Sequence, residues 1–132
     1  MNWIILIGNE NFNLSCIRAV NYIGSIAAYD VKDIPNRFCV EYPKDHIFYD
    51  VESDLTDYND TLKNIPISSP NVIMMSYSSS SLIRTVITQS DFPKDIYIDN
   101  TAGIVLPIEE FIRKDIPLDQ QELNEQLDKS NN

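Results

Sequence analysis

Hydrophobic residues fall into short runs along the chain, and these runs predict alternating strands and helices. Residues Trp3 to Ile7 form a continuous apolar run closed by Gly8, which is typical of a strand buried on both faces. Apolar positions then recur at helical spacing over residues 12–23, and Gly24 ends that pattern. We therefore expect a central first strand followed by a first main helix.

The next part of the chain predicts paired strands. A second strand is expected over residues 25–31. Polar and apolar residues alternate over residues 37–51 around the turn Pro43-Lys44-Asp45, which predicts an antiparallel hairpin. The acidic segment 52–64 carries a weaker helical pattern, so we expect a short exposed helix or a structured loop there.

The second half of the chain predicts the remaining elements and completes the fold class. They are a strand over residues 72–75, a second main helix between the serine run 76–81 and Asp91, short strands over 96–98 and 103–106, and a helix opened by Pro107. Asp119 with Glu122 can cap one more helix. We expect a single α/β domain over residues 1–118, with a mixed central sheet and two main helices. Residues 119–132 should form a tail that is partly helical and then frayed.

Composition limits the function. The 132 residues suffice for one core, and 20 acidic against 10 basic residues give a net charge of −10. An anionic surface repels phosphate backbones and anionic lipids, so nucleic-acid and membrane binding are disfavoured. The chain has one His and three Gly, which removes most catalytic and phosphate-binding motifs. We expect a binding protein, with no enzymatic activity, cofactor or metal.

The cysteines and the N-terminus indicate the compartment. Cys16 and Cys39 lie among apolar neighbours without a CxxC spacing, which is typical of buried thiols in a reducing cytosol. The apolar N-terminal run has no basic segment before it and no small-residue cleavage site after it. We expect a cytoplasmic protein that is a monomer when free.

The densest feature is an acidic stretch between Glu41 and Asp60, where seven acids stand against one basic residue, Lys44. Tyrosines are interleaved with these acids, as in surfaces that steer a basic partner and supply rigid contact area. A solvated loop explains the charges about equally well. The residues expected to bind a partner are Asp45, Tyr49, Asp50, Glu52, Asp54, Asp57, Tyr58 and Asp60.

Three other features have ordinary interpretations. The alternation Asp50-x-Glu52-x-Asp54 resembles the start of a calcium loop, but Leu55 and Thr61 stand where that loop needs Gly and Glu. His46 lies beside acids, and a hairpin histidine with one hydrogen bond explains it better than a catalytic base. The serine run 76–81 can bind an anion or cap a helix, and we favour the cap.

Two families resemble this chain. The runs Ile4–Ile7, Phe48–Asp50, Val72–Ser76 and Tyr97–Ile98 are similar in type and spacing to the strands of response-regulator receiver domains. Asp50 then stands where such domains carry the phosphoacceptor, and Asn9-Glu10 where they carry an acidic pair. Asp99-Asn100 replaces their lysine, so this resemblance implies a signalling or protein-interaction module without phosphotransfer.

In its format the whole chain resembles the immunity proteins of bacterial contact-dependent growth inhibition and related polymorphic toxin systems. The shared features are a small, acidic, single α/β domain, a composition rich in Asn, Ile and Asp, and the lack of catalytic motifs. Such proteins neutralise a toxin, often a basic nuclease, by covering its active site. This resemblance implies a cognate toxin domain as partner, and it is our first hypothesis; the receiver-like module is the alternative.

Overall fold

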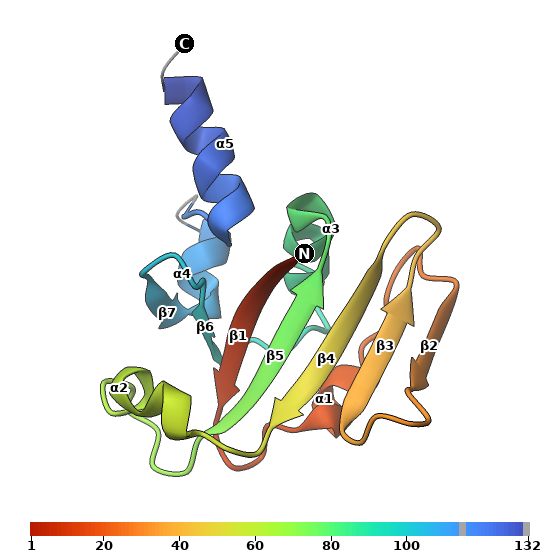
Figure 1. Ribbon diagram of the computed structural model, residues 1–132, viewed down its shortest axis with the longest axis horizontal. Coiled ribbons are helices and arrows are strands. Elements are labelled where there is room, and N and C mark those ends of the chain that lie inside the picture. Colours follow the sequence, from red (N-terminus) through yellow and green to blue (C-terminus); the bar gives the residue numbers. More distant parts are fainter. Residues whose placement is uncertain (114–115, 131–132) are drawn as a thin grey trace.

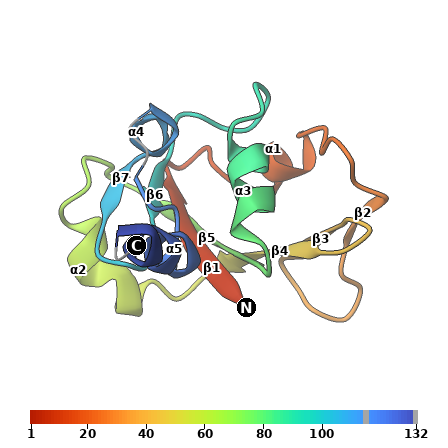
Figure 2. The same cartoon turned by 90° about the horizontal axis from the view of Figure 1, so that it is seen from above.

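The computed structural model describes residues 1–113 and 116–130 and forms one seven-stranded sheet with helices packed against it (Figures 1 and 2). The strands are β1 (Asn2–Gly8), β2 (Ala27–Asp30), β3 (Arg37–Glu41), β4 (His46–Glu52), β5 (Asn71–Tyr77), β6 (Tyr97–Asp99) and β7 (Val105–Pro107). The helices are α1 (Leu14–Arg18), α2 (Asn59–Leu62), α3 (Ser80–Ile87), α4 (Ile108–Arg113) and α5 (Gln120–Ser130), with a 3₁₀ turn η1 (Thr56–Tyr58) before α2.

The strands lie in the order β2-β3-β4-β5-β1-β6-β7. β1 pairs with β5 on one side and β6 on the other, and its residues Ile4 to Ile7 are all buried. The central position expected for the first apolar run is therefore confirmed. The hairpin expected over residues 37–51 is confirmed as β3 and β4, with Arg37 opposite Asp50 and Glu41 opposite His46.

The α/β class with a single compact domain is confirmed, but the strand directions differ from the expectation. We expected a mixed sheet, and all six pairings among the described residues are antiparallel. The direction in which β1 meets β5 and β6 depends on contacts between residues far apart in the sequence. The apolar runs predict that these strands are buried, but they carry no information on which strand pairs with which.

The first main helix is much shorter than expected. The pattern over residues 12–23 predicts one helix, but α1 ends at Arg18, and Val20 and Tyr22 reach the core from irregular backbone. Side chains from the segment after α3 bond this backbone: Asp91 and Gln89 accept from the amides of Asn21 and Ile23, and Gln89 donates to the Asn21 carbonyl. These tertiary bonds replace the helical ones, so apolar spacing alone overestimates the helix.

The sheet has two unlike faces. Helices α1, α3 and α4 cover one of them, and Figure 2 shows these helices on the same side of the sheet. On the opposite face, the segment over residues 55–67, which includes η1 and α2, packs against the β1, β5 and β6 region. Figure 1 looks onto this second face, where no helix crosses the outer strands β2, β3 and β4. We call this uncovered region, together with the adjoining positions Ser76 on β5 and Trp3 on β1, the open face.

The C-terminal segment is docked at its beginning. Leu118 and Asp119 are buried, and the Asp119 carboxylate accepts from the Glu122 amide at 2.9 Å, which confirms the expected cap. Packing of the domain therefore continues past residue 118, where we placed the start of the tail. Figure 1 shows α5 rising beyond the end of the sheet, and its helix includes Lys129 and Ser130, which we expected to fray. The last two residues of the expected tail lie outside the described residues.

Candidate functional site

The open face carries a row of side chains that the strand register places side by side. Tyr29, Cys39, Phe48, Ser76 and Trp3 follow one another across β2, β3, β4, β5 and β1. Trp3 is 49% exposed and Tyr29 is 43% exposed, whereas Cys39 and Ser76 are buried between their neighbours. Aromatic residues that stay exposed on a sheet face offer rigid contact area to a partner.

Charged and polar groups lie next to this row. Arg37 donates two hydrogen bonds to the Asp50 carboxylate, at 2.7 and 3.1 Å, and its guanidinium lies 4.8 Å from the centre of the Phe48 ring. The ring of His46 lies 4.7 Å from that of Phe48. Asp50 raises the pKa of Arg37 because the pair favours the charged guanidinium. The open face is therefore ordered by its own contacts before any partner binds.

This arrangement answers the question that the receiver resemblance raises about Asp50. A receiver-like site needs Asp50 at a strand end beside Glu10. Asp50 instead lies within β4, opposite Arg37 and Met74, and Glu10 follows the end of β1. The Asp50 carboxylate bonds Arg37 on the neighbouring strand.

Four of the expected acids gather where β4 ends and η1 and α2 begin. Glu52 is half-buried, while Asp54, Asp57 and Asp60 are exposed. Burial and the carboxylates of Glu52, Asp57 and Asp99 raise the pKa of Tyr58, so Asp99 from β6 joins the same cluster. We call Glu52, Asp54, Asp57, Asp60 and Asp99 the acidic surface. It adjoins the open face because Phe48, Asp50 and Glu52 alternate along one side of β4.

Several residues of the acidic surface also hold the local structure. The Asp54 carboxylate accepts from the Thr56 amide and hydroxyl at 3.0 and 2.6 Å, and these bonds lower the pKa of Asp54. Asp60 lies 3.4 Å from Lys63 in an exposed ion pair, a type that contributes little to stability. Asp57 and Asp60 are thus the acids most available to a partner.

Two expected site residues lie elsewhere. Tyr49 is fully buried on the helix-covered side of β4, because neighbouring residues of a strand point to opposite faces, so its place in the expected partner site is wrong. Asp45 lies at the other end of β4, where its carboxylate accepts from the amides of Ser78 and Ser79 at 3.3 and 2.9 Å. Those amides precede α3, so an internal carboxylate fills the place where an anion would bind.

The serine run forms the helix cap that the sequence favours, and His46 lies in the hairpin as expected. Ser79 caps α3 by accepting from the Leu82 amide at 3.4 Å, as favoured from the sequence. His46 borders a shallow hollow of about 330 Å³ that is also lined by Glu41, Lys44 and Asp45. The His46 ring lies against the Phe48 ring in a tilted arrangement, and the His46 amide donates to the Asp45 carboxylate at 2.8 Å.

Comparisons of the chain with protein-family models, curated proteins and solved structures give no match. Within residues 1–113 and 116–130, no three His, Cys, Asp or Glu side chains are grouped so that they could hold a metal ion. In the same residues, every helix is too short or too polar to cross a bilayer. Both cysteines are free thiols, Cys39 buried and Cys16 half-buried.

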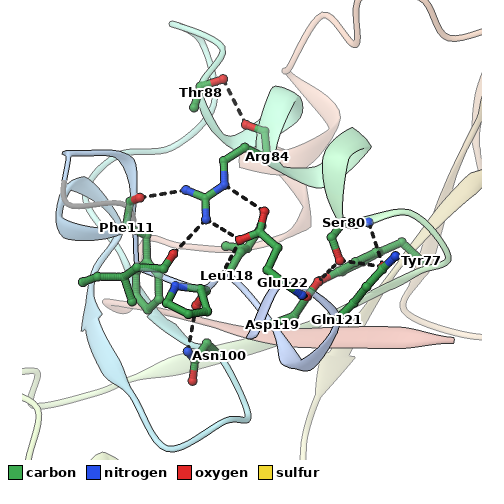
Figure 3. Close-up of polar contacts among 12 residues, drawn as sticks. Tyr77, Ser80, Arg84, Thr88, Asn100, Phe111, Leu118, Asp119, Gln121 and Glu122 are labelled. Carbon is green, nitrogen blue, oxygen red and sulfur yellow. Dashed lines mark hydrogen bonds and ion pairs between the residues drawn. The ribbon is translucent and has the colours of Figure 1, made fainter. Parts of the chain in front are cut away.

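A buried polar network that sequence reasoning missed ties the C-terminal helix to the domain (Figure 3). The Asp119 carboxylate accepts from the hydroxyls of Tyr77 and Ser80, each at 2.5 Å. Arg84 donates to both oxygens of Glu122 and to the carbonyls of Phe111 and Ile116. The network positions α5, with Asp119 and its two hydroxyl partners buried.

The aromatic residues of the open face were also missed as a group. The apolar run predicts that Trp3 lies in a buried strand, and the patterns around Tyr29 and Phe48 predict strands without indicating a surface role. The period of two within β4 was the available signal, since it separates Phe48 and Asp50 from Tyr49. Joining Trp3 and Asp99 to these residues requires the pairing of β1 with β5 and β6, which no local pattern contains.

Proposed function

We propose that this protein is an immunity protein: it binds a cognate bacterial toxin, with a basic nuclease as the favoured class, and neutralises it by covering its active site. We place this activity in the cytoplasm. The observation that carries the proposal is that the acidic surface and the exposed aromatic residues lie on the same side of the sheet, connected along β4 from Phe48 to Glu52.

Charge is the first support. Enzymes that bind phosphate backbones present basic side chains around the site where the phosphate lies. A partner with clustered carboxylates meets that potential with the opposite sign and accelerates encounter. Asp57 and Asp60 are exposed in neighbouring turns, so both can approach basic side chains without a change of fold.

The neighbouring aromatic residues supply what charges alone do not. Exposed ion pairs contribute about 0–1 kcal/mol each, so a tight complex needs buried contact area as well. Trp3, Tyr29 and the half-buried Phe48 offer that area on a sheet that is rigid before binding. A short path along β4 connects the two regions, so one partner can contact both.

The proposal requires a gene for a secreted toxin next to this one, and co-production with that toxin domain tests it. The chain should restore growth and form a stoichiometric complex with that domain. The variant Asp57→Lys/Asp60→Lys should weaken the complex strongly. Its matched control is Glu125→Lys/Asp128→Lys on α5, which changes the same charge at the same spacing on exposed positions and should bind nearly as the native chain does.

Melting temperatures of both variants are measured first, because unfolding mimics lost binding. Association rates of the native chain should fall steeply with added salt, since salt screens charges over about 10 Å at 0.1 M. Equal binding by the two double variants would remove the acidic surface from the interface. Failure of the chain to restore growth against the adjacent toxin domain would refute the proposed function.

A further inference from the structure

β2 is an edge strand with one neighbour. Among the described residues it pairs with β3 alone, and Figures 1 and 2 both show it at the outer margin of the sheet. The amide of Val31 donates to the Arg37 carbonyl at 3.0 Å, which fixes the alternation along β2. Residues 27, 29 and 31 thus direct their backbone groups to β3, and Ala28 and Asp30 direct theirs outward. An outer row of backbone donors and acceptors is a template for another strand.

The surroundings of this edge are apolar. Ile23 is 72% exposed and Ile26 is 67% exposed just before β2, and Ile34 is exposed just after it. With Tyr29 these residues account for four of the seven large hydrophobic side chains recorded as exposed among the described residues. Exposed apolar side chains concentrated at a free strand edge mark an interaction site.

Charge indicates which partner fits. The chain carries −10 overall, but residues 11–40 contain three basic and two acidic residues. Asp30, the one charged residue within β2, is paired with Arg18 at 2.8 Å. The edge is therefore close to neutral in a strongly acidic protein. A basic partner gains nothing there, whereas a second copy of the edge meets it without repulsion.

We infer that two copies of this chain associate through β2, in antiparallel pairing about a two-fold axis at Tyr29. In this register Ala28 of each copy exchanges both backbone hydrogen bonds with Asp30 of the other, and the two Tyr29 side chains lie opposite each other on the open face. If the two-fold axis passed through Asp30 instead, the Asp30 side chains of the two copies would lie opposite each other and repel. Centring on Ala28 would need the Ile26 amide to point outward, but it donates to the Glu41 carbonyl at 2.8 Å.

Sedimentation velocity of the isolated protein over a concentration series tests the dimer, and the toxin plays no part in it. The contact is small, so the dimer should dissociate on dilution. Ala28→Pro removes an outward amide that β3 does not use and should raise the dimer dissociation constant at least tenfold. Ala28→Val keeps the amide and should leave it unchanged. Circular dichroism must show native structure for both variants.

A second pair of variants leaves the backbone intact. Tyr29→Lys keeps a side chain that can approach Glu41, the present partner of the Tyr29 hydroxyl at 2.6 Å, and places two lysines opposite each other across the axis. It should dissociate the dimer. Trp3→Lys on the same face, distant from the edge, should not.

Cross-linking tests the register. With Cys16 and Cys39 both changed to Ser, Tyr29→Cys should form a disulfide dimer under mild oxidation, because directly opposed residues of this kind lie about 4.5 Å apart at Cα. Thr85→Cys, exposed on α3, should not. A native protein that stays monomeric at all concentrations, as expected from the sequence, would overturn the inference. So would equal cross-linking at both positions.

Discussion

Removing the hydroxyl group from either of two buried tyrosines should change the free energy of unfolding in opposite directions. The Tyr49 hydroxyl is fully buried and has no partner in hydrogen-bond geometry among the described residues, and burial raises its pKa strongly. The Tyr22 side chain interacts with Tyr49 and adds to that shift, but the two hydroxyls fall short of hydrogen-bond geometry, and Tyr22 donates its own proton to the Ile17 carbonyl at 2.9 Å. The Tyr77 hydroxyl, also buried, donates to Asp119 at 2.5 Å. Tyr49→Phe should stabilise the fold, and Tyr77→Phe should destabilise it.

The size of each stability change depends on whether the hydroxyl that is removed has a hydrogen-bond partner. A buried polar group without a partner costs about 1–3 kcal/mol, so Tyr49→Phe should recover about 1 kcal/mol after the small void left by the oxygen is counted. A hydrogen bond to a charged group contributes about 1.5–3 kcal/mol, so Tyr77→Phe should lose about that amount. Ser80 and the Glu122 amide still bond Asp119 in that variant, which keeps the loss within this range. The two variants should differ by about 3 kcal/mol.

Urea unfolding at pH 7, followed by fluorescence and circular dichroism, measures both free energies of unfolding. Coincident transitions and equal m-values are the controls, because they show that two states suffice. Tyr22→Phe is a further comparison, since it deletes a hydroxyl bonded to a backbone carbonyl and should be mildly destabilising. Equal losses in Tyr49→Phe and Tyr77→Phe would refute the reasoning, because they would show that Tyr49 has a partner as good as Asp119.

Two further predictions concern pH and the thiols. Burial raises the pKa of Tyr22, Tyr49 and Tyr77 above the ordinary 10.0, so these groups ionise in the unfolded chain first. Stability is complete below pH 10 and should fall above it by about 4 kcal/mol per pH unit, at about 1.4 for each tyrosine. The part of the tyrosinate absorbance that disappears in the Phe variants of these three residues should therefore rise together with loss of circular dichroism, and its appearance in folded protein would contradict this. Thiol labelling followed by mass spectrometry should modify the half-buried Cys16 before the buried Cys39, because burial raises the pKa of the Cys39 thiol. Faster labelling of Cys39 would mean that the edge formed by β2 and β3 opens readily.

Local patterns determined which segments are strands and which ends are capped. The apolar run of β1 and the alternation in the hairpin 37–51 each reflect burial on one or two faces, and burial follows a fixed period along a strand. The caps at Ser79 and Asp119 are also local, because a helix end binds side chains within three residues. Sequence also located the acidic stretch correctly as a feature of the chain.

Tertiary structure decided which of those residues act together. Tyr49 left the candidate site and Asp99 joined it, because strand pairing decides which face is covered and which residues are neighbours, and the pair Ile5 and Asp99 is joined across most of the chain. The helix over residues 12–23 stopped at Arg18 because Gln89 and Asp91 bond the backbone after it. Pairing of this kind has no local signature: the free energy that selects it comes from burial and hydrogen bonds shared between distant segments, and those exist only once the sheet has formed.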